Sequence, residues 1–188
     1  VLTCTPIGAG DPDGDPMGFV FEWVRGGDAL ADASGDVLDG RFEKGDVIVC
    51  RATPSDPFGV GGAVESNAVT IGNTPPAGGY VSVSPATGVT EATVLTCNAS
   101  GASDLDGDAV SWRFGWRVDG LDTGVSVDSL TGQHFDRGQS VQCTATPFDG
   151  EAVGVAVSSG AFTVENSVPS LATATLTPSE TPRAGTLT

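Results

Sequence analysis

The chain has 188 residues, a formal net charge of −16 and a hydrophobic fraction of 39%. Such an acidic chain repels phosphate backbones and anionic lipid surfaces, which argues against nucleic-acid binding and membrane association. No stretch approaches the ~18 apolar residues of a membrane span, so this segment is not expected to insert into a membrane. The 27 glycines and 12 prolines, against one lysine and one methionine, favour turns and strands over helices, so the predicted class is all-β.

An internal repeat organises the sequence. The acidic pattern Asp11-Pro-Asp13-Gly-Asp15 returns 93 residues later as Asp104-Leu-Asp106-Gly-Asp108. Each copy lies between a cysteine and a tryptophan, and a second cysteine closes each unit. The sequence therefore predicts two copies of one module, at residues 1–74 and 75–168, with residues 169–188 supplying the first strand of a third.

Alternation of apolar and polar residues predicts the strands in chain order. In the first copy, the acidic loop spans residues 8–16 and residues 26–36 hold only a weak edge strand. The strands expected in this copy are Val1–Thr5, Gly18–Arg25, a short one at Leu38, Asp46–Pro54 and Ala63–Ile71.

The segment Asn73-Thr-Pro-Pro76 is predicted to be a linker, and its two prolines favour an extended, semi-rigid connection. A second linker is expected at Asn166-Ser-Val-Pro169. The strands expected after the first linker are Tyr80–Pro85, Ala92–Asn98, Ser111–Val118, a short one near Leu130, Ser140–Pro147, Ala156–Val164 and Thr173–Pro178.

The first copy has no counterpart of the strand predicted at Tyr80–Pro85. The chain therefore looks like a piece of a longer protein that continues on both sides. A bare sheet edge recruits strands, so neighbouring repeats are the expected partners, and self-assembly by strand addition is a further possibility.

The four cysteines form one pair per copy, Cys4 with Cys50 and Cys97 with Cys143, each 46 residues apart. A disulfide in each pair pins two sheets together across a core, with Trp23 or Trp116 packed against it. Closing a loop of that length stabilises a module by about 4 kcal/mol. Four free thiols are the alternative, and zinc is disfavoured because no closely spaced ligands are present. Disulfides indicate an oxidising, extracellular or cell-surface location.

The acidic loops are candidate calcium sites, because calcium takes six to eight oxygen ligands. In a two-sheet sandwich these loops lie at the same end as the later loops that carry Asp56 and Asp149. The predicted ligands are Asp11, Asp13, Asp15 and Asp56 in one site, and Asp104, Asp106, Asp108 and Asp149 in the other, with Asn73 from the linker within reach of the second. Bound calcium would stiffen the junction between modules. The alternative is a solvated turn, since Asp and Gly are turn residues.

Catalysis finds little support in the sequence. The one histidine, His134, is interpreted as a surface residue, and no nucleophile elbow or zinc-binding histidine pair occurs. Trp112 is interpreted as a core residue, with a sugar-stacking platform as the alternative. Asn98-Ala-Ser100 is a formal glycosylation site.

The pattern Leu-Thr-Cys, Asp-x-Asp-Gly-Asp, Trp, Phe-x-x-Gly and Cys-x-Ala-Thr-Pro-x-Asp, found in both copies, resembles the tandem immunoglobulin-like repeats of large bacterial secreted and surface proteins. The resemblance implies immunoglobulin-like β-sandwiches in a stalk, adhesin or surface filament. It departs from the antibody-type pattern because Ile48 and Val141 replace the tyrosine two residues before the second cysteine.

The sequence thus predicts a structural, non-enzymatic repeat of an extracellular fibre, filament, stalk or adhesin, stiffened by calcium at the junctions between repeats. The alternative is an accessory module of a secreted polysaccharide-degrading enzyme, with a glycan or cell-surface ligand.

Overall fold

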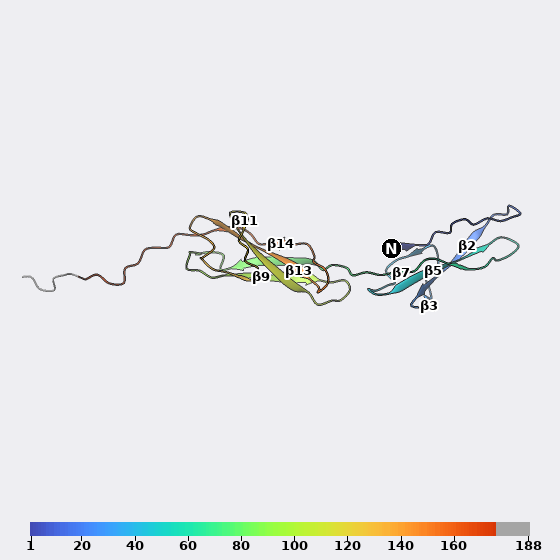
Figure 1. The fold of residues 1–188 in the computed structure, drawn as a ribbon, viewed down its shortest axis with the longest axis horizontal. Coiled ribbons are helices and arrows are strands. Elements are labelled where there is room, and N and C mark those ends of the chain that lie inside the picture. The colour runs from blue at the N-terminus through green and yellow to red at the C-terminus, as the bar shows by residue number, and fades with distance from the viewer. Residues whose placement is uncertain (176–188) are drawn as a thin grey trace, which may run out of the picture. The chain divides into compact units, whose positions relative to one another are not determined.

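A computed structural model describes residues 1–175, and in that range the chain forms strands and turns but no helix (Figure 1). No helix of the described part is therefore long and apolar enough to cross a membrane. The predicted all-β class is confirmed. Residues 176–188, which include half of the strand expected at Thr173–Pro178, lie outside the described range, and residues 173–175 are not in a strand.

The first pair of sheets uses residues 2–70. Strands β1 and β4 make a two-stranded sheet, and the second sheet has the order β3-β2-β5-β6, with β7 also paired to β5. The strands are β1 (Leu2–Thr3), β2 (Gly18–Arg25), β3 (Asp28–Ala29), β4 (Val37–Leu38), β5 (Val47–Ser55), β6 (Val64–Glu65) and β7 (Val69–Thr70).

The second pair of sheets uses residues 77–163. One sheet has the order β12-β9-β8, and the other has the order β11-β10-β13-β14, with β15 also paired to β13. The strands are β8 (Ala77–Ser84), β9 (Leu95–Ser103), β10 (Ser111–Val118), β11 (Leu121–Asp122), β12 (Ser129–Leu130), β13 (Ser140–Phe148), β14 (Val157–Ser158) and β15 (Phe162–Thr163). The larger sheets of the two pairs share one strand order, which is that of the immunoglobulin-like fold.

Each pair of sheets carries one disulfide. Cys4 bonds Cys50, and Cys97 bonds Cys143, with 6.1 Å between Cα atoms in both pairs. Trp23 and Trp116 are buried beside these bonds, and their ring N–H groups donate to the carbonyls of Gly35 and Val127. The predicted pairing of cysteines is confirmed, and no free cysteine remains.

The long strands β2 and β10 begin and end where the sequence analysis placed them. The expected last strand of each copy is instead two short pieces, β6 with β7 and β14 with β15. Between the pieces, the backbone N–H groups of Cys50 and Cys143 donate to the hydroxyls of Ser66 and Ser159. A side chain therefore replaces a ladder carbonyl at this point, which interrupts the strand.

Contacts between Cα atoms divide the chain into two units. The first contains residues 1–80, 99–113 and 145–157, and the described part of the second contains residues 81–98, 114–144 and 158–175. Both acidic loops and the segment around Asn73 belong to the first unit. This division runs through β8, β9, β10, β13 and β14, so the module boundaries at residues 74 and 168 stay a prediction.

Candidate metal centre

Both acidic loops make the same turn. The Oδ1 atom of Asp11 accepts the backbone N–H of Asp13 at 2.9 Å and that of Asp15 at 3.1 Å. The Oδ1 atom of Asp104 accepts the equivalent bonds from Asp106 at 2.8 Å and Asp108 at 3.4 Å. The glycines of the pattern lie in the left-handed region, with φ of 81° at Gly14 and 83° at Gly107, where a side chain would be strained. The first aspartate thus organises each loop, and the glycine permits the turn.

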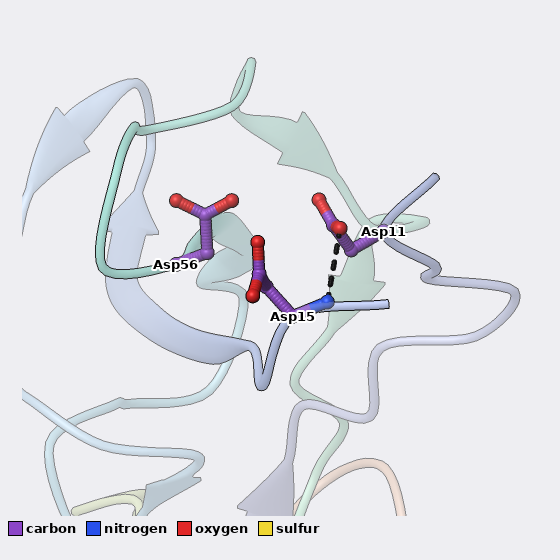
Figure 2. Close-up of side chains that lie close together, drawn as sticks. All are labelled: Asp11, Asp15 and Asp56. Carbon is purple, nitrogen blue, oxygen red and sulfur yellow. Dashed lines mark hydrogen bonds between the residues drawn. The ribbon is translucent and has the colours of Figure 1, made fainter. Parts of the chain in front are cut away.

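In the first loop, Asp11 and Asp15 meet Asp56 from the loop after β5. One carboxylate oxygen of each lies within 4.8 Å of the others, and Figure 2 shows the three side chains pointing toward one another. Asp56 is itself held by two bonds to its Oδ1 atom, from the backbone N–H groups of Phe58 at 2.7 Å and Gly59 at 2.6 Å. We call Asp11, Asp15 and Asp56 the first acidic cluster. Its carboxylates come from two loops at one end of β2 and β5.

The three aspartates of the second acidic loop come together without a carboxylate from the loop after β13. One carboxylate oxygen each of Asp104, Asp106 and Asp108 lies within 4.8 Å of the others, and all three residues are partly buried. We call them the second acidic cluster. Its members repel one another as carboxylates unless a proton or a cation is present.

One oxygen of the second acidic cluster has no hydrogen-bond partner. The Oδ2 atom of Asp104 is buried and unpaired, and it is the one such side-chain atom in the described part of the chain. A buried charged oxygen without a partner is costly, because nothing replaces the water that it loses. The position therefore suits a cation.

The segment predicted to be a linker contacts this cluster directly. The backbone N–H and the hydroxyl of Thr74 donate to Asp106, at 2.6 and 3.3 Å. The amide of Asn73 donates to the Oδ2 atom of Asp149 at 2.8 Å. Pro76 is fully buried, and a Cβ atom added to Gly154 would overlap its carbonyl oxygen. Residues 73–76 are thus fastened to the second acidic cluster and to the loop after β13.

Lys44 supplies the positive charge at this place. Its ammonium lies 2.8 Å from Asp108 and 2.9 Å from Glu151, and it donates to the side-chain carbonyl of Asn73 at 2.6 Å. Hydrogen bonds to Asp108 and then to Glu151 raise the pKa of Lys44, so the ammonium form is favoured.

Asp149 is held in its charged form. The amide of Asn73, followed by the backbone N–H groups of Ala152 and Glu151, lowers the pKa of Asp149 to about 2. These donors stabilise the carboxylate, and the charge of Lys44 adds a smaller contribution.

Of the nine predicted calcium ligands, six lie in the two acidic clusters and three lie outside them. Six aspartates gather in two clusters, whereas Asp13 is exposed and Asp149 and Asn73 bond to each other beside the second acidic cluster. As a calcium-binding set, all nine residues stay a prediction.

Sequence reasoning missed Lys44, Thr74 and Glu151. Lys44 could have been singled out from the sequence, because it is the only lysine in the chain.

The other candidate residues do not contribute to these clusters. His134 is exposed, and its backbone N–H donates to the carbonyl of Thr131. Trp112 is partly buried, and its ring lies where a Cβ atom of Gly79 would be. Trp112 is not among the buried core residues of the described chain, so its interpretation as a core residue stays a prediction.

Comparison with known proteins gives only distant likenesses. No family model and no curated protein matches the chain. Among solved structures, the chain is similar to the chicken CNTN1 FN1–FN3 domains, with 7% identity and a TM-score of 0.34, covering 81% of this chain and 58% of that one. It is also similar to fibronectin(III)-like modules of Clostridium thermocellum CbhA, with 18% identity and a TM-score of 0.34, covering 78% of this chain and 77% of that one. Likenesses this low carry no argument about function, and the fold assignment rests on the strand order and the disulfides.

Proposed function

We propose that this chain is a structural, non-enzymatic segment of an extracellular fibre, stalk or adhesin, and that calcium bound by the acidic clusters stiffens the connection at residues 73–76. The observation that carries the proposal is the unpaired, buried Oδ2 atom of Asp104 in a group of three carboxylates. An oxygen in that position gains a partner when a cation binds.

The chemistry of the donors supports calcium. The clusters offer oxygen ligands alone, which hard cations prefer, and the described part of the chain places no histidine or cysteine in either cluster. Backbone carbonyls and water complete the six to eight ligands that calcium needs.

A mechanical role follows from what the second acidic cluster touches. Asp106 binds Thr74, and Asp149 binds Asn73, so a cation that orders the acidic loop also orders the connecting segment. Two disulfides support an oxidising location for a protein with this role.

Calorimetric titration with calcium, followed by thermal melting in calcium and in chelator, tests the proposal. We expect binding, a higher melting temperature in calcium and a narrower range of conformations in small-angle scattering. Identical melting and scattering curves in calcium and chelator would contradict it.

The matched variants are Asp104→Asn and Asp39→Asn. An asparagine at position 104 retains an oxygen for the N–H groups of Asp106 and Asp108 but removes the charge, so calcium should bind more weakly while the loop keeps its turn. Asp39 is exposed and outside both clusters, so its variant controls for the change in net charge.

A further inference from the structure

Lys44 makes contacts that a surface lysine does not ordinarily make. Its ammonium reaches three oxygens at 2.6 to 2.9 Å, on Asn73, Asp108 and Glu151. These partners lie 29, 64 and 107 residues further along the chain (73 − 44, 108 − 44 and 151 − 44). An ammonium has three N–H donors, so the three oxygens use its full donor capacity.

Within residues 1–175, the first acidic cluster has no comparable cation. In the part of the chain that the structure describes, the ion pairs involve Arg25, Lys44 and Arg51, and none of them reaches Asp11, Asp15 or Asp56. Two clusters built on one sequence pattern therefore differ in whether a protein cation already occupies part of the carboxylate set.

We propose that Lys44 is the resident cation of the second acidic cluster. Without metal it fastens Asn73 to Asp108 and Glu151, and when calcium binds it gives up Asp108, so that lysine and calcium exchange at that carboxylate. The metal-bound half of this inference rests on the proposed function, whereas the metal-free half does not.

The physical reason is that Lys44 and calcium compete for the negative charge of Asp108. Asp108 uses its Oδ2 atom for Lys44, and a divalent ion placed among Asp104, Asp106 and Asp108 would be repelled by the ammonium a few ångströms away. Lys44 therefore lowers the calcium affinity of the second acidic cluster and leaves that of the first unchanged.

Acylation of the single lysine tests the metal-free half. A short pulse of an amine-reactive ester in chelator, read by mass spectrometry, compares Lys44 with the exposed Val1 amine as an internal reference. We expect the relative rate at Lys44 to rise several-fold in Asp108→Asn and in Glu151→Gln. A rate in the folded wild-type chain equal to that in urea, or unchanged in both variants, overturns this half.

Calcium binding tests the exchange. In a background that carries Asp15→Asn to silence the first acidic cluster, Lys44→Met should tighten calcium binding about tenfold, as expected from removing one charge near a divalent ion. Arg41→Met removes the same charge from an exposed residue three positions earlier, outside both clusters, and should change the affinity little. Unchanged or weaker binding in Lys44→Met overturns the exchange.

The same acylation pulse during a calcium titration separates the two proposals. A rise in Lys44 reactivity as calcium binds supports the exchange. Calcium binding without any change at Lys44 overturns the exchange and leaves the proposed function standing. If calcium binds neither the wild type nor its variants, the proposed function fails, and so does the metal-bound half, while the metal-free result stands or falls by its own measurement.

Discussion

The two acidic loops share a sequence pattern and a turn, yet they gather different carboxylates. The first loop recruits Asp56 and leaves Asp13 exposed, whereas the second uses Asp106 and leaves Asp149 outside. The difference arises because Thr74 donates two hydrogen bonds to Asp106. Which carboxylates gather is therefore decided by the segment that contacts the loop and not by the loop pattern.

The cores of the two pairs of sheets differ as well. Around the first disulfide, the buried residues are Cys4, Trp23, Leu38, Ile48 and Cys50. In the second pair of sheets, β8 adds the buried side chains Val81 and Val83, and the described chain provides no third strand for the sheet of β1 and β4. The same fold thus rests on a smaller core in the first pair of sheets, where the disulfide matters more.

Removing a disulfide should lower the free energy of unfolding more than any of the other changes. Replacing both cysteines of a pair by alanine should cost about 4 kcal/mol in either case, because both loops close over 46 residues. The smaller core around Cys4 and Cys50 should not tolerate that loss, whereas the sheets around Cys97 and Cys143 should stay folded. Hydrogen exchange along β5 and β13 measures this, and protection of β5 that survives loss of Cys4 and Cys50 would refute the asymmetry.

Adding one methyl group should cost different amounts of stability in the loop after β5 and in the loop after β13. Gly154→Ala places a Cβ atom on the carbonyl oxygen of Pro76, whereas the equivalent Gly61→Ala comes closest to the ring of Pro54, at 2.8 Å. We expect Gly154→Ala to destabilise the protein by about 1–3 kcal/mol and Gly61→Ala by less, because a ring moves more easily than a fastened backbone. Urea denaturation gives both values, and equal losses would show that residues 73–76 are not packed there.

Acid should weaken the contact between Asn73 and Asp149. The pKa of Asp149 is lowered to about 2 in the folded chain, so this carboxylate stabilises the fold above its unfolded pKa of 3.8 and loses that contribution as the pH falls toward 2. Asp149→Asn should therefore flatten the decline of stability between pH 4 and pH 2. Asn73→Ala, which removes the largest cause of the shift, should flatten it too, and melting at several pH values tests both. An unchanged slope in both variants would count against the contact.

The smallest change in melting temperature should come from removing the two exposed ion pairs of Arg51. Arg51 binds Glu22 and Glu65 on the surface of the first pair of sheets, and the residue 93 positions later is Thr144, which pairs with the hydroxyl of Ser158. Because exposed ion pairs contribute little, Arg51→Thr should barely move the melting temperature. A loss comparable to that of Gly154→Ala would show that the sheet depends on this charge.

The sequence by itself determined the long strands β2 and β10 and the disulfides. Alternation fixed β2 and β10 at their observed bounds, since one face of each strand must be buried, and equal spacing paired the cysteines. The turn of each acidic loop was also local, because it depends on an aspartate and a glycine within five residues.

The tertiary structure alone decided which carboxylates meet and what neutralises them. Lys44 and Thr74 reach the second acidic cluster, and Glu151 reaches Lys44, from parts of the chain that no local pattern connects. The interruption of the last strand by Ser66 and Ser159 was equally hidden, because a serine hydroxyl takes the place of a backbone carbonyl only once the strands are paired. Contacts of this kind depend on distances between remote segments, and the order of residues does not contain them.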